Sequence, residues 1–108
     1  MEVSMETKTG AGIIALTGDL DFQSFRELEQ AFELAMTSGP ERVIVEISGV
    51  PHIDSVGLGT LTRLWREANK KGVTVALAGP RKNVSSMIKL VNLDGRIKLF
   101  NSVSEALS

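Results

Sequence analysis

The chain has 108 residues, of which 43% are apolar and 23% charged, and its formal net charge is −1. A chain of this length can bury one hydrophobic core without disulfides or structural metals, so we expect a single domain over residues 1–108. Cysteine is absent, which excludes thiol nucleophiles and cysteine-based metal sites, and the near balance of 12 basic and 13 acidic residues argues against nucleic acid as a partner.

The N-terminal half predicts a β-hairpin, a helix and a buried strand. Apolar and polar residues alternate over 3–7, Gly10-Ala11-Gly12 supplies a turn, and the run 13–16 is apolar. Between residues 25 and 35, apolar side chains recur at the spacing of one helix face. Residues 43–47 are mostly β-branched and nearly all apolar, as expected of a strand that is covered on both faces.

The C-terminal half alternates helices with strands. After a connector, a second helix is predicted whose buried face is formed by Leu58, Leu61, Trp65 and Ala68. A strand over 73–78, a short helix over 84–91, a strand over 96–100 and a last helix opened by 102–105 follow. Strands joined through helices run parallel with right-handed crossovers. We therefore expect an α/β fold of order ββαβαβαβα, with a mixed, mostly parallel five-stranded sheet and helices packed against it.

Polar residues at the predicted helix starts are candidate caps. Asp21 or Ser24 can cap the first helix, and Ser24 and Glu27 have the spacing of a capping box. Residues 102–105 repeat that spacing, and Asn83 can cap the third helix. No apolar run has the length of a membrane-spanning helix, and the first residues lack the layout of a signal peptide, so we expect a cytoplasmic protein without membrane contact.

His52, Asp54 and Ser55 have the residue types of a hydrolase triad. Their crowding into one connector argues against it, because the chain would have to fold back to place the imidazole between nucleophile and carboxylate. The G-x-S-x-G elbow also lacks its first glycine. In the dinucleotide pattern G-x-G-x-x-G, Gly57-Leu58-Gly59 is followed by Thr62 at the third glycine. We favour a loop or helix-cap role for His52 and tight packing for the glycines. A small nucleotide-binding or hydrolytic enzyme is kept as an alternative.

Ser55 lies at the predicted start of the second helix, where the first backbone amides have no partner within the helix. The pattern alone favours Ser55 as the N-cap, with its hydroxyl accepting from the amide of Gly57 or Leu58. The same position suits a phosphoryl group, which would meet unpaired amides and the positive end of the helix dipole while staying exposed. Both roles are open.

Asp19 and Asp21 follow the second predicted strand, and the pattern favours turn and helix-cap roles for them. If the second and third strands are parallel neighbours, their carboxyl ends meet on one rim, where open α/β sheets place ligand and partner contacts. One face can then carry Asp19 and Asp21 together with Asp54 and Ser55.

Two segments carry a resemblance to a known family. Residues 16–21 (Leu-Thr-Gly-Asp-Leu-Asp) and 53–59 (Ile-Asp-Ser-Val-Gly-Leu-Gly), in this order and on this pattern of elements, resemble the bacterial anti-sigma factor antagonists, whose fold is called the STAS domain. The family carries L-T-G-E/D-L-D after its second strand and D-S-S/T/A-G-L-G at its second helix. The resemblance spans the whole chain and implies the STAS fold.

The resemblance also implies a mechanism. Ser55 stands at the serine that an anti-sigma factor, an ATP-dependent serine kinase, phosphorylates in this family. The unphosphorylated form binds the anti-sigma factor and frees the sigma factor, phosphorylation ends this activity, and a separate phosphatase restores it. Val56 departs from the Ser or Thr often found there, which removes an alternative phosphate acceptor. The expected partner-binding residues are Asp19, Asp21, Asp54, Ser55, Val56 and Gly57.

STAS domains also occur in sulphate transporters, stress-signalling assemblies and lipid-transport systems, so a scaffold subunit of such an assembly is a second alternative. For the antagonist, the resemblance implies no catalytic residues, no metal and no cofactor. We expect it to be a monomer when free.

Overall fold

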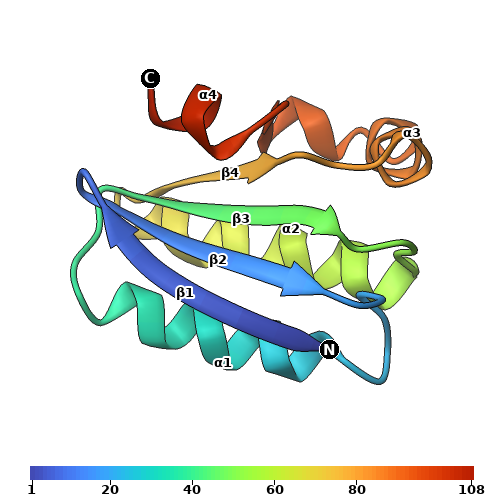
Figure 1. Ribbon diagram of the computed structural model, residues 1–108, viewed down its shortest axis with the longest axis horizontal. Helices are drawn as coiled ribbons and strands as arrows, with labels where there is room; N and C mark the ends of the chain where they lie inside the picture. The colour runs from blue at the N-terminus through green and yellow to red at the C-terminus, as the bar shows by residue number, and fades with distance from the viewer.

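The computed structural model describes residues 1–108 and forms a five-stranded sheet with strand order β1-β2-β3-β4-β5. Figure 1 labels the strands β1 to β4 of this sheet. The antiparallel hairpin β1–β2 joins three parallel neighbours, which confirms the predicted α/β fold and mixed sheet. None of the helices is long and apolar enough to cross a bilayer. The elements are β1 (Glu2–Lys8), β2 (Ala11–Thr17), α1 (Phe25–Met36), β3 (Arg42–Gly49), α2 (Ser55–Lys70), β4 (Thr74–Ala78), α3 (Lys82–Leu90), a 3₁₀ turn (Leu93–Gly95), β5 (Lys98–Phe100) and α4 (Val103–Leu107).

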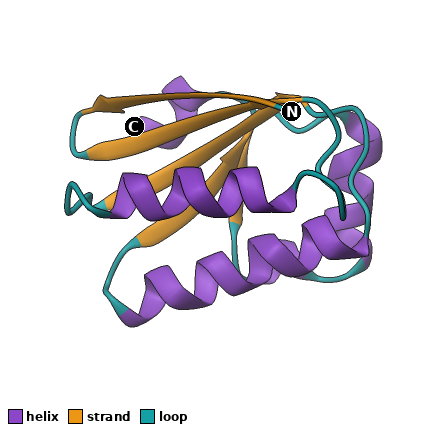
Figure 2. Ribbon diagram, turned by 90° about the horizontal axis from the view of Figure 1, so that it is seen from below, coloured by secondary structure: helices purple, strands orange, loops and turns teal.

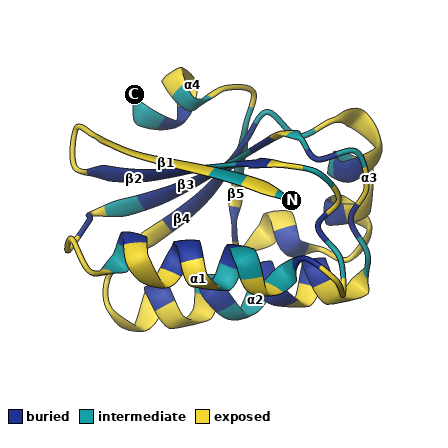
Figure 3. Cartoon of the chain, turned by 60° about the horizontal axis from the view of Figure 1, so that its bottom comes forward, coloured by how far each residue is buried: buried dark blue, intermediate teal, exposed yellow.

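The two long helices α1 and α2 lie side by side across one face of the sheet (Figure 2). An ion pair between Arg63 of α2 and Glu29 of α1 joins them. The short helix α4 covers part of the opposite face (Figure 3). It is tied to the sheet by Arg42, whose Nη1 donates to the carbonyl of Ala106 at 2.8 Å. The helices therefore form unequal layers on the two sides of the sheet.

The central strand β3 contributes to both layers, because successive side chains of a strand point to opposite faces. Val43, Val45 and Ile47 belong to the main core under α1 and α2, and Ile44 belongs to a smaller cluster that includes Ala106 of α4. All four side chains are buried. This confirms the prediction that residues 43–47 form a strand covered on both faces.

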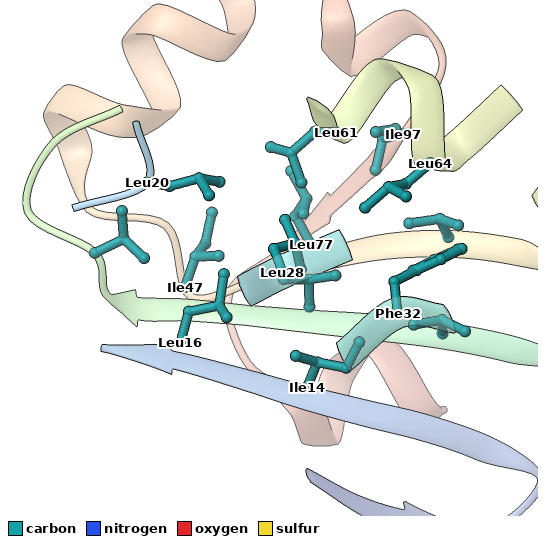
Figure 4. Packing of buried hydrophobic residues seen from close by; sticks show 14 of the residues in the cluster. Ile14, Leu16, Leu20, Leu28, Phe32, Ile47, Leu61, Leu64, Leu77 and Ile97 are labelled. Atoms are coloured by element: carbon teal, nitrogen blue, oxygen red, sulfur yellow. The ribbon is translucent and has the colours of Figure 1, made fainter. Parts of the chain in front are cut away.

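The main core fills the space between the sheet and the helices α1 and α2 (Figure 4). Leu28 of α1 and Leu61 of α2 are buried within it, and each such side chain stabilises the fold by about 1.5–3 kcal/mol. The predicted inner face of α2 is correct for Leu58, Leu61 and Ala68. Trp65 is only half-buried at the edge of the core, and Leu64 occupies the deeper position.

Two of the predicted helix caps are wrong. The hydroxyl of Ser24 faces back into the preceding loop, where it accepts from the Asp21 amide at 3.1 Å and donates to the Asp19 carbonyl at 2.6 Å, so no capping box forms with Glu27. Asn83 already lies inside α3, so its side-chain amide does not cap the helix but donates to the Pro51 carbonyl at 2.7 Å.

The predicted box at 102–105 is half correct. Ser102 caps α4, because its hydroxyl accepts from the Glu105 amide at 3.1 Å. The Glu105 carboxylate accepts from the Asn101 amide at 3.2 Å instead of returning to Ser102. The second hydrogen bond of the capping box, from a backbone amide to the glutamate side chain, therefore comes from the residue before the N-cap.

Candidate functional site

The loops that follow β2 and β3 are connected to each other by backbone hydrogen bonds. Leu20 and Ile53 form an isolated parallel bridge, the Leu20 amide donates to the His52 carbonyl at 3.0 Å, and the Asp54 amide donates to the Leu20 carbonyl at 3.3 Å. The β2–α1 loop and the β3–α2 loop therefore lie side by side at one end of the sheet, on the right in Figure 1. This is the shared rim that parallel pairing of the two strands predicted.

Asp54 caps α2 and also holds the neighbouring loop. Its Oδ1 accepts from the Gly57 amide at 2.8 Å, and its Oδ2 accepts from the Phe22 amide at 3.1 Å. The Asp54 backbone is extended, as an N-cap requires. The interpretation of Ser55 as the N-cap is therefore wrong, because the residue before it supplies the capping oxygen.

Ser55 is the first residue of α2, and it is exposed. Since Asp54 supplies the cap, the Ser55 hydroxyl is not needed to hold the helix start. The backbone amides of Ser55 and Val56 have no backbone acceptor, as expected in the first turn of a helix. The structure thus places an uncovered hydroxyl beside two donors at the positive end of the helix dipole.

Asp19 forms a pair with His52 at the surface. The Nδ1 of His52 lies 3.3 Å from Oδ1 of Asp19, and the two side chains are 77% and 49% exposed. The imidazole therefore faces Asp19 and does not stand between Asp54 and Ser55, as a triad would need. His52 is a loop residue, which agrees with one of its two expected structural roles, and it caps no helix.

Asp21 organises the β2–α1 loop. Its Oδ1 accepts from the Gln23 amide at 3.0 Å and from the Ser24 amide at 3.2 Å, which is the predicted turn role. The predicted cap role is wrong, because Ser24 occupies the N-cap position of α1 and both of these amides precede the helix. The acidic residues of the rim do not converge with other side chains into a group that could hold a metal ion. In this structure the carboxylates of Asp21 and Asp54 accept hydrogen bonds from the backbone.

The two glycines of α2 differ in their surroundings. A Cβ added to Gly57 would lie 2.4 Å from the Leu20 carbonyl oxygen and 2.8 Å from Cγ1 of Ile53. A Cβ added to Gly59 would meet nothing within 4 Å. The predicted tight packing is therefore correct for Gly57, which lets α2 approach the β2–α1 loop, and wrong for Gly59.

The sequence patterns do not single out Phe22 as an exposed residue of this rim. This side chain is 64% exposed, although its backbone amide is fixed by Asp54. The sequence does contain one signal for this residue. Phe22 is an aromatic residue among polar turn residues, between the motif at 16–21 and the apolar face of α1. Val56, which follows Ser55 directly in the sequence, is an apolar residue at 37% exposure, whereas Gly57 is buried.

Comparisons with known proteins agree with this fold and these motifs. The STAS domain model matches residues 2–106. A 76-residue stretch is 29% identical to a proposed anti-sigma factor antagonist of Thermotoga maritima, covering 70% of this chain and 67% of that protein. Over 106 residues the chain is 24% identical to the anti-sigma-F factor antagonist RsfB of Mycobacterium tuberculosis, which covers 98% of this chain and 86% of that protein.

Among solved structures, the crystal structure of a proposed anti-sigma factor antagonist from Thermotoga maritima has a TM-score of 0.89 to this chain. The match covers 97% of this chain and 91% of that one at 23% sequence identity, so it shows a shared fold. The family model covers nearly the whole sequence, and the two motifs lie on the rim where the β2–α1 and β3–α2 loops meet. The chain therefore belongs to the STAS domain family.

Proposed function

We propose that this chain is an anti-sigma factor antagonist. In this proposal the unphosphorylated form binds an anti-sigma factor serine kinase and releases the sigma factor, phosphorylation of Ser55 inactivates the antagonist, and a phosphatase restores it. The observation that carries the proposal is the exposed hydroxyl of Ser55 at the first position of α2, left uncommitted because Asp54 supplies the cap. The names of the relatives support the same role.

The chain supplies the substrate of the modification. The Ser55 oxygen attacks the γ-phosphorus of ATP bound in the kinase, its proton passes to a base of the kinase, and ADP leaves. The phosphoryl group then lies at the N-terminus of α2, near the unpaired amides of Ser55 and Val56. We place this exchange in the cytoplasm, where ATP and the transcription apparatus are found, and we propose a monomer as the free form.

The added charge is large enough to act as a switch. Phosphoserine adds about −1.5 to −2 at neutral pH. If the phosphate faces a carboxylate in the complex, one like-charge contact at about 4 Å and an effective dielectric of about 20 costs roughly 4 kcal/mol. That corresponds to a loss of affinity on the order of a thousandfold. No change of fold is required.

Phosphorylation of the purified protein by each anti-sigma factor serine kinase encoded in its source genome tests the proposal. With ATP, one of these kinases should add a single phosphoryl group, which peptide mass spectrometry should locate on Ser55. Ser55→Ala should abolish the modification, and Ser104→Ala, at another exposed serine, should leave it intact. Modification at a different serine, or by none of the kinases, would contradict the proposal.

Binding of Ser55 variants to that kinase tests the switch separately. Ser55→Ala should bind as the unmodified protein does and resist inactivation by ATP. Ser55→Asp should bind more weakly because it places a negative charge at the same position. Isothermal titration calorimetry measures both affinities, and equal values for the two variants would count against a charge-based switch.

A further inference from the structure

The most exposed aromatic side chain of the molecule belongs to the loop that is held by Asp54, the residue before the proposed phosphorylation site. Phe22 is 64% exposed, while its backbone amide donates to Oδ2 of Asp54 at 3.1 Å. Its main chain is therefore one hydrogen bond away from the residue that precedes Ser55. Single exposed apolar side chains are common on protein surfaces, and what distinguishes this ring is the fixed backbone that carries it beside Asp54.

The loop that carries Phe22 is fixed on both sides of the residue. Before it, Leu20 bridges Ile53 and exchanges backbone hydrogen bonds with the β3–α2 loop. After it, Asp21 accepts from the amides of the next two residues. A ring with only two side-chain torsions on a fixed backbone loses little conformational entropy on binding. Phe22 therefore has the properties of an interface hot spot.

The neighbouring carboxylates are already committed within the chain. Both oxygens of Asp54 accept backbone amides, and Oδ1 of Asp21 accepts two. Asp19 faces His52 at 3.3 Å. These acidic side chains hold the rim in shape, and the large apolar side chain that this segment leaves exposed is Phe22.

We infer that Phe22 is the anchor of the partner interface and inserts into an apolar pocket of the anti-sigma factor kinase beside its active site. This inference rests on the proposed function. Asp21 and Asp54 act as positioning residues that present the ring next to Ser55. The anchor touches no reacting atom, so it contributes to docking of the protein substrate and leaves the transfer of the phosphoryl group itself unchanged.

Affinity measurements with matched variants test the anchor. Phe22→Ala should weaken binding to the kinase that phosphorylates Ser55 by about thirtyfold or more, the size of a hot-spot effect, and Phe22→Leu should recover part of the loss. The control is Leu34→Ala on α1, since Leu34 is 63% exposed and lies near the end of α1 remote from the rim, and its affinity should stay unchanged. Both Phe22 variants should melt at the wild-type temperature because the backbone bond of residue 22 remains, and Leu34→Ala should do so because its side chain is exposed.

Kinetics separate docking from chemistry. In phosphorylation assays, Phe22→Ala should raise KM for the protein substrate by a similar factor and leave kcat unchanged. Asp21→Asn, which keeps the accepting oxygen, should retain binding, whereas Asp21→Ala should lose it through disorder of the loop. A merely structural role for Phe22 would lower the melting temperature and would give no such split.

Two results would overturn the inference. The first is an unchanged affinity and KM for Phe22→Ala with a kinase that phosphorylates wild-type Ser55, which leaves the proposed function standing. The second is a loss of affinity in Leu90→Ala together with an unchanged affinity in Phe22→Ala. Leu90 on α3 is 76% exposed and lines a hollow of about 560 Å³, so it would then be the anchor. Failure of every kinase to bind the wild type would reject function and anchor together.

Discussion

Replacement of Gly57 by alanine tests how the start of α2 is seated against the rim. The new Cβ would lie 2.4 Å from the Leu20 carbonyl oxygen, which is 0.6 Å inside the 3.0 Å that Cβ atoms essentially never cross. That oxygen belongs to the backbone and also accepts the Asp54 amide, so neither it nor the helix can shift without disturbing the cap. Overpacking of this kind costs about 1–3 kcal/mol.

The higher helix propensity of alanine offsets part of that cost, by about 0.8–1 kcal/mol. Gly59→Ala isolates this gain, because its Cβ would meet nothing within 4 Å on the same helix. We therefore expect Gly57→Ala to lower the free energy of unfolding by up to about 2 kcal/mol, the overpacking cost net of the propensity gain, and Gly59→Ala to raise it by up to about 1 kcal/mol.

Urea unfolding followed by circular dichroism measures both values, and thermal melting should give shifts of opposite sign. For a domain of this size, 1 kcal/mol corresponds to about 4–8 °C. A Gly57→Ala protein as stable as Gly59→Ala would refute the close approach of α2 to the β2–α1 loop. It would also mean that the Leu20 carbonyl does not require a glycine at position 57.

Further predictions concern the cap and the core. Asp54→Ala should cost about 0.5–2 kcal/mol for the lost cap, whereas Ser55→Ala should stay within about 0.5 kcal/mol of the wild type in the same urea titration; the reverse order would make Ser55 the cap after all. Leu61→Ala should cost about 2–5 kcal/mol because the side chain is 1% exposed, and a smaller loss is expected for half-buried Trp65→Ala. Equal losses in denaturant midpoint at the two positions would contradict the assignment of the inner face of α2.

The fold was largely predictable because its signals are repeated along the chain. The apolar run in β3 and the helical spacing in α1 each specify an element, and alternation of strands and helices leaves few ways to connect them. The parallel pairing of β2 with β3 then brings the two motif loops to one rim. The STAS resemblance rested on the same two segments, and the family match confirms it.

The details of the rim were less predictable because tertiary contacts decide between equivalent residues. Aspartate and serine are both good N-cap residues, so the sequence does not decide between Asp54 and Ser55. In the structure Asp54 is the cap, and its second carboxylate oxygen also accepts a hydrogen bond from the Phe22 amide. Gly57 and Gly59 look alike in the sequence, and only the nearby Leu20 carbonyl distinguishes them. A side chain that points outward, such as Phe22, leaves no periodic signal.

The two-sided role of the Asp54 carboxylate has a dynamic consequence. One carboxylate joins the first turn of α2 to a loop 32 residues earlier, so we expect the fluctuations of these segments to be coupled. Local unfolding of either segment removes one hydrogen bond from the other, so we expect their backbone amides to lose protection from hydrogen exchange together. A partner that binds this rim thus meets two loops whose relative position is fixed by the same carboxylate.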